Sequence, residues 1–134
     1  MLNPFPELLS LGLVAPLILR LVVGLIFINT GYLKITKEKQ RWTIFLNAIH
    51  LKPAKQLVLV LGLIEIIAGA LLVVGMGTQY VCVVLLVLTA KEWAVEYKED
   101  VLVARDIVFY TLVGAILLSL LLTGAGFLAF DLPL

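Results

Sequence analysis

The sequence predicts an all-α integral membrane protein, a single domain of residues 1–134 that folds as a four-helix bundle. Hydrophobic residues make up 63% of the chain, and the mean hydropathy is +1.16. Soluble domains are only about 45–50% apolar, so the excess must face lipid or a partner. The apolar residues also form continuous runs rather than alternating ones, which favours helices over a β-barrel, because backbone groups in lipid must be satisfied internally.

Four apolar runs are each close to the ~20 residues that cross ~30 Å of hydrocarbon. The first contains Pro16 and one internal charge, Arg20. The second ends at Gly75-Met76-Gly77, a helix-stop signal, and the third follows at once, so these two form an antiparallel hairpin. The predicted spans are about 16–35, 57–75, 78–97 and 106–123.

The connection between the first two spans contains a short amphipathic segment, about residues 41–50. Apolar residues at positions 42, 45, 46 and 49 share one helical face, with lysines on either side. This pattern predicts an interfacial helix lying along the membrane surface. A structured loop packed on the bundle remains the alternative.

Basic residues set the predicted orientation in the cell membrane. Cytoplasmic loops carry an excess of Lys and Arg. Both the N-terminal and C-terminal tails lack basic residues, and so does the short turn between spans two and three. Loops 36–56 and 98–105 are therefore predicted to be cytoplasmic, with both termini outside. The basic residues in or beside these two loops are Lys34, Lys37, Lys39, Arg41, Lys52 and Lys55, then Lys91, Lys98 and Arg105.

Several function classes are excluded or disfavoured by composition. A net charge of +1 gives no basic surface for nucleic acid. Cys82 is the only cysteine, so neither an intramolecular disulfide nor a thiol-exchange pair can form. His50 is the only histidine, which leaves too few ligands for zinc or for a haem held by two histidines. No phosphate loop, dinucleotide fingerprint or Ser-His-Asp set occurs.

An acidic row lies at the end of the third span. Glu92, Glu96 and Glu99 share one face of a helix, and carboxylates alone suit a hard cation. We favour the reading in which they face cytoplasmic solvent or pair with nearby basic residues, and we predict no metal site. Trp93 and Tyr97 fall where an interfacial aromatic belt is expected, with quinone stacking as the alternative.

Ionisable residues at membrane depth cost ~2.5–3.5 kcal/mol each on insertion scales and so need partners or a purpose. Four residues qualify, Arg20, Glu65, Lys91 and Glu92, and of these Glu65 lies near the middle of span two. Counted from the membrane midplane by the rise per residue, Glu65 lies roughly 1–2 Å and Lys91 about 4–5 Å toward the cytoplasm, whereas Arg20 lies about 9 Å toward the outside. Lys91 therefore matches Glu65 best, while Arg20 can reach inward, snorkel outward or meet Asp131.

Two interpretations of these polar residues remain open. In the first, Arg20, Glu65, Lys91 and Asn29 form a polar site in the bundle that binds a head group or relays a proton. In the second, Glu65, Lys91, Arg20 and Asp131 supply structural ion pairs that hold the helices in register.

Three segments resemble the DoxX family of small four-helix membrane proteins. The first is Leu19-Arg20-Leu21-Val22-Val23-Gly24-Leu25-Ile26-Phe27 followed by Gly31 and Lys34. The second runs from Gly62 through Glu65 and Gly69 to Gly75, and the third from Thr123 through Gly124 and Gly126 to Asp131. The third lacks the proline common between the glycines, and the Lys91-Glu92 pair is not a familiar family feature.

The resemblance extends the functional hypotheses. Relatives include the DoxD-type membrane subunit of a thiosulfate:quinone oxidoreductase, which implies a quinone as candidate cofactor and makes Arg20 and Glu65 the best candidates for a polar site. The leading hypothesis is a redox-linked component that binds quinone in the bundle. The alternatives are a non-catalytic membrane partner or assembly factor, and then a small transporter or channel subunit. Besides membrane lipid, the expected partners are another membrane protein or further copies of the same chain. The sequence leaves open whether the chain is an enzyme.

Overall fold

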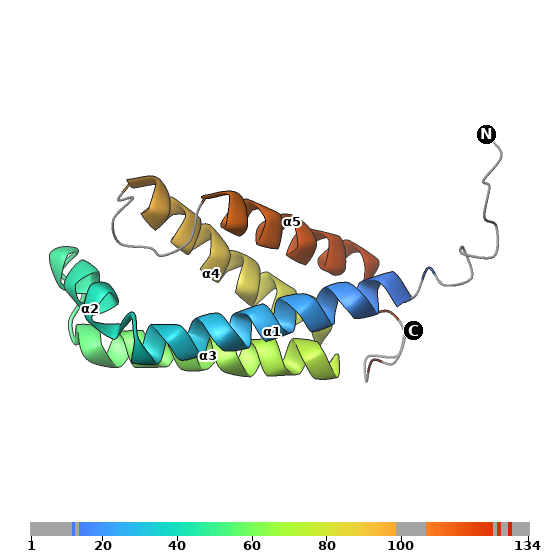
Figure 1. Cartoon of the computed structure of the whole chain (residues 1–134), viewed down its shortest axis with the longest axis horizontal. Helices are drawn as coiled ribbons and strands as arrows, with labels where there is room; N and C mark the ends of the chain where they lie inside the picture. Colours follow the sequence, from blue (N-terminus) through green and yellow to red (C-terminus); the bar gives the residue numbers. More distant parts are fainter. Residues whose placement is uncertain (1–11, 13, 99–106, 125, 127–128, 130–134) are drawn as a thin grey trace.

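The computed structural model describes residues 12, 14–98, 107–124, 126 and 129, and every regular element within them is an α-helix (Figure 1). The fold is therefore all-α, but these residues form five helices rather than four. The additional helix is the short α2, in the segment between the first two predicted spans. The helices are α1 (Val14–Thr36), α2 (Lys39–Ala48), α3 (Ala54–Val74), α4 (Thr78–Lys98) and α5 (Ile107–Thr123).

Three of the described helices are long and apolar enough to cross a membrane. They are α1, α3 and the part of α4 from Thr78 to Val95, whereas α5 is a shorter apolar helix of 17 residues. Large hydrophobic side chains cover the outward faces of all four, including Leu25, Ile67, Val87 and Leu112. A face of this kind is stable in contact with lipid chains rather than with water.

The helices form two antiparallel pairs, α1 with α3 and α4 with α5 (Figure 1). Buried residues of α1 recur at helical spacing along one face, which is why one stripe of the helix packs inward. The pairs meet around an apolar core contributed by α1, α3, α4 and α5. Its fully buried members are Val23, Leu72, Cys82, Leu85, Leu117 and Leu120.

Two glycine pairs bring α1 and α3 unusually close together. A Cβ added to Gly31 would lie 2.6 Å from the carbonyl oxygen of Gly62, and one added to Gly24 would lie 2.8 Å from the carbonyl oxygen of Gly69. Side chains of ordinary size would force the backbones apart, so this seam depends on small residues. The seven-residue spacing of Gly62 and Gly69 predicts such a seam, and the structure confirms it.

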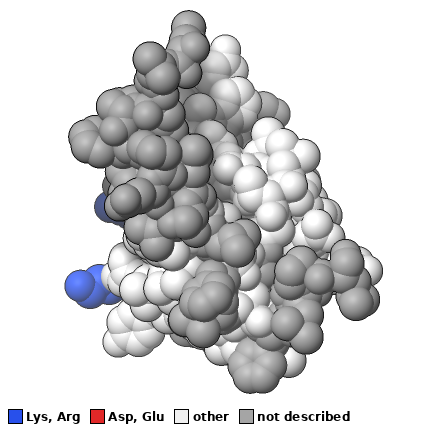
Figure 2. Space-filling model, turned by 90° about the vertical axis from the view of Figure 1, so that its right-hand side faces the viewer, with Lys and Arg blue, Asp and Glu red and all other residues white. Residues whose placement is uncertain are grey.

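The turn between α3 and α4 lies at one end of the bundle. Gly75 has φ +77°, and its N–H donates to the carbonyl oxygen of Leu71 at 2.8 Å, which closes the helix. The buried Arg20 guanidinium packs against this glycine. Figure 2 looks at this end, and its described atoms include no acidic residue and only a small basic group at one edge.

Helix α2 closes the opposite end. It fills the segment predicted to be amphipathic, and its Trp42 and Leu46 are buried against Ala54 and Val58 of α3. Its other faces carry basic residues, because Lys39 and Arg41 are exposed. Among the described residues, the exposed basic side chains therefore gather around α2 rather than at the α3–α4 turn.

Candidate functional site

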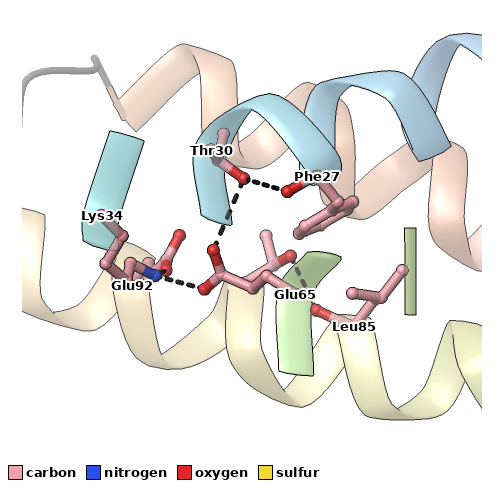
Figure 3. A network of polar contacts seen from close by, with 7 residues as sticks. Phe27, Thr30, Lys34, Glu65, Leu85 and Glu92 are labelled. Carbon is pink, nitrogen blue, oxygen red and sulfur yellow. Dashed lines mark hydrogen bonds and ion pairs between the residues drawn. The ribbon is translucent and has the colours of Figure 1, made fainter. Parts of the chain in front are cut away.

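A cluster of three charged side chains lies inside the bundle near its α2 end (Figure 3). Lys34 comes from the last turn of α1, Glu65 from the middle of α3 and Glu92 from α4. The Nζ of Lys34 forms ion pairs with an oxygen of each glutamate. Their exposed fractions are 3%, 0% and 4%, so the ion pairs are withdrawn from solvent and lipid alike.

The direction of helical side chains explains how Lys34 reaches the cluster. A side chain in a helix leans toward the N-terminus of that helix. For both α1 and α4 this direction points from the α2 end toward the bundle centre (Figure 1). The long stem of Lys34 thus carries its ammonium inward to Glu65, and Glu92 leans inward in the same way.

Thr30 adds a hydroxyl to the cluster. Its Oγ1 lies 3.1 Å from the carbonyl oxygen of Phe27 and 3.5 Å from Oε2 of Glu65. A hydroxyl has one proton to donate, so these two acceptors share it. Glu65 therefore has a partner on each oxygen, Lys34 on Oε1 and Thr30 on Oε2 (Figure 3).

Trp42 of α2 covers the cluster. The Nζ of Lys34 lies 4.7 Å from the centroid of its ring, and the Nζ of Lys91 lies 5.5 Å from the same centroid. Both distances fit cation–π attraction. The two lysines and two glutamates carry formal charges that cancel, so the assembly can be neutral as a whole.

The structure brings only some of the predicted site residues together. Glu65 is at the centre, and Lys91 stands beside it across Trp42. The cation that pairs with Glu65 is Lys34, not Lys91. Arg20 lies at the other end of α1 beside Gly75, and Asn29 is exposed, away from the cluster. Asp131 lies outside the described residues, so its predicted pairing with Arg20 stays a prediction.

Comparison with known families gives one result. The profile of the DoxX family matches residues 15–95, which is more than half of the chain and includes all three members of the ion cluster. The chain belongs to the DoxX family. No curated protein and no solved structure matches it significantly. Family membership and the long apolar helices together indicate a membrane protein.

Neither Lys34 nor Glu92 was predicted from the sequence to be a site residue of this DoxX protein. Lys34 was counted among the basic residues of the first loop, although it lies seven and fourteen positions after the buried Phe27 and Arg20. That spacing places all three on one face of α1 and is the signal that could have identified it. Glu92 was expected to face solvent or to pair with Lys98 or Arg105, but it is buried and pairs with Lys34 instead.

The acidic row and the two aromatic residues of α4 lie only partly within the part of this DoxX protein that the structure describes, which leaves out the side chain of Glu96. Within the described residues no group of three His, Cys, Asp or Glu side chains could hold a metal ion. Glu99 lies outside those residues. Trp93 and Tyr97 stack with ring centroids 5.8 Å apart, and both are exposed on the outer face of α4.

Proposed function

We propose that this DoxX protein is a multi-pass membrane protein whose helix bundle binds a quinone head group, as a redox-linked component of the cell membrane. The observation that carries the proposal is the buried cluster of Lys34, Glu65 and Glu92. Three charges inside a membrane bundle cost several kcal/mol on insertion scales, at ~2.5–3.5 kcal/mol each, so a functional site is the default reading.

The chemistry of the cluster suits such a ligand. Reduction of a quinone adds protons to its oxygens along with electrons, and oxidation releases them. Carboxyl and ammonium groups in the bundle interior can donate hydrogen bonds to those oxygens and exchange protons with them. The chain's own residues would bind and orient the head group, while electrons would come from a separate carrier.

A second candidate function rests on a different feature of the same cluster. Lys34 of α1 forms one ion pair with α3 and one with α4, and such pairs can also serve only to hold helices together. Together with the exposed apolar faces of the helices, this supports a non-catalytic membrane partner or assembly factor. The two functions predict different ligands in the purified protein.

We expect wild-type protein purified in mild detergent to retain quinone, detected by mass spectrometry, and Glu65→Gln to lose most of it. The amide keeps the size of the side chain but removes its charge and its proton-exchanging oxygen. Glu38→Gln, at the start of α2 and outside the cluster, is the matched control and should retain quinone. Quinone absent from wild type, with protein partners recovered instead, would favour the assembly-factor function.

The topology is part of the proposal. We propose that α5 is a fourth span and that the α2 end, with its exposed basic residues, faces the cytoplasm, as the positive-inside rule predicts. With four spans, the α3–α4 turn and the end of α5 then lie on the outside, on the same side as both termini.

Single-cysteine labelling tests this topology in a Cys82→Ser background. Gln79→Cys and Thr123→Cys, both at exposed positions, should react with a membrane-impermeant maleimide on intact cells. Lys52→Cys, beside α2, should react only after permeabilisation. Labelling of Lys52→Cys from outside would reverse the orientation. Protection of Thr123→Cys alongside a reactive Gln79→Cys would show that α5 does not cross.

A further inference from the structure

One polar atom beside the ion cluster has no hydrogen-bond partner among the described residues. Trp42 is 4% exposed, and within the described residues its indole Nε1 makes no hydrogen bond. An indole N–H can only donate. Buried donors are nearly always satisfied, so one left open next to a charged cluster marks a place where an acceptor from outside the chain fits.

Lys91 is the second donor at this place. It is partly buried, and in the part of the chain that the structure describes no carboxylate lies within ion-pairing distance of its Nζ. Instead, its Nζ lies 5.5 Å from the centroid of the Trp42 ring. The two donors therefore lie close together, one on α2 and one on α4, and Lys91 is the more exposed of the two.

The charges around this region decide which acceptor fits. Lys34 is already compensated by Glu65 and Glu92, and the excess negative charge of those two is balanced by Lys91. An anion placed here would leave the buried group with net negative charge, which a membrane interior penalises. A neutral oxygen acceptor adds hydrogen bonds without adding charge.

We propose that Trp42 Nε1–H and Lys91 Nζ form a donor pair that binds the carbonyl oxygen of an uncharged amphiphile. The carbonyl can come from a quinone, in which case the inference rests on the proposed function, or from the ester of a neutral glycerolipid. The apolar tail has a path along the outer face of α4, because the exposed Val84 and Val87 precede Lys91 at helical spacing.

The indole N–H signal of Trp42 tests the donor pair directly. The chain has two tryptophans, so Trp93→Phe leaves Trp42 as the only indole. The full chain, labelled with ¹⁵N-tryptophan, is placed in nanodiscs of ether-linked phosphatidylcholine, which contain no ester carbonyl. Decylubiquinone or dioleoylglycerol is then added, and we expect the Trp42 N–H resonance to move downfield and to saturate.

The contribution of Lys91 is measured in the same background. A hydrogen bond from a charged donor is worth roughly a tenfold change in affinity or more, so Lys91→Met should raise the apparent Kd at least tenfold. Lys91→Arg, which keeps the charge and donors, should restore much of the affinity. Lys55→Met, at an exposed position of α3, is the matched control and should leave the Kd unchanged.

The results with the different added ligands distinguish the donor pair from the proposed quinone function. If neither decylubiquinone nor dioleoylglycerol moves the resonance, the donor pair is wrong, even where quinone still co-purifies and depends on Glu65. If dioleoylglycerol alone moves it, the donor pair stands with a lipid ester as its ligand, and quinone binding is judged separately by co-purification with wild type and Glu65→Gln. If inorganic phosphate moves it while both neutral ligands do not, the site takes anions and the charge argument is overturned.

Discussion

Replacing Lys34 with methionine is expected to destabilise the bundle by about 3–5 kcal/mol, the range for breaking a buried ion pair by removing one partner. The variant leaves Glu65 and Glu92 buried close to each other with their shared cation gone. The thermal unfolding midpoint is measured by monitoring the reaction of Cys82 with a maleimide dye as the protein is heated. Cys82 is fully buried in the core, so it reacts only when the bundle opens.

A second variant identifies charge as the cause. Combining Lys34→Met with Glu65→Gln and Glu92→Gln leaves no uncompensated carboxylate, and replacing a whole buried ion cluster by neutral groups is often close to neutral for stability. The triple variant should therefore be more stable than Lys34→Met alone. Lys37→Met, at an exposed position just after α1, is the matched control and should unfold like wild type. A wild-type midpoint for Lys34→Met would contradict a structural role for the cluster.

The sequence predicted the long helices because hydropathy along the chain reports which segments can face lipid. Spans predicted at about 16–35, 57–75 and 78–97 correspond to α1, α3 and α4, the three helices long and apolar enough to cross. Hydropathy did not predict that α2 would pack on the bundle, since Trp42 and Leu46 could equally have rested on the membrane surface. Which helices pair is also a tertiary property: the Gly62–Gly69 spacing predicted a packing seam on α3, but not that α1 is the helix packed against it.

The site was predicted less completely for a geometric reason. Depth estimated from Cα positions correctly made Glu65 a residue in need of a partner, but it overlooked the reach of a lysine side chain. Gly31 lies level with Glu65, because a Cβ added there would lie 3.1 Å from Cβ of Glu65. Lys34 begins three residues farther along α1 and still delivers its ammonium to Glu65, because its stem leans back along the helix. Whether Glu92 faces the bundle interior depends on how α4 is rotated about its own axis. The sequence pattern alone does not determine that rotation.

The α1–α3 seam carries the second large expected effect. Gly31→Ala should lower stability by about 1–3 kcal/mol, the usual cost of overpacking a close contact. The new Cβ would lie 2.6 Å from the carbonyl oxygen of Gly62 and 3.1 Å from Cβ of Glu65. A backbone oxygen cannot rotate away, so the two helices must separate. Glu65 moves with α3, and its contact with Lys34 on α1 should loosen as a consequence.

Gly114→Ala is the matched control for this variant. Gly114 is also a helical glycine, on α5, but a Cβ there would meet nothing closer than 4.0 Å, at Cγ2 of Thr89. Alanine in a helix is favoured over glycine by roughly 0.5–1 kcal/mol, so this variant should be as stable as wild type or slightly more so. The same Cys82 assay compares the two. If Gly31→Ala matched Gly114→Ala, close approach of α1 and α3 would not be what holds the Lys34–Glu65 pair together. If it unfolds earlier, and quinone retention falls with it, the seam and the ion cluster act as one unit.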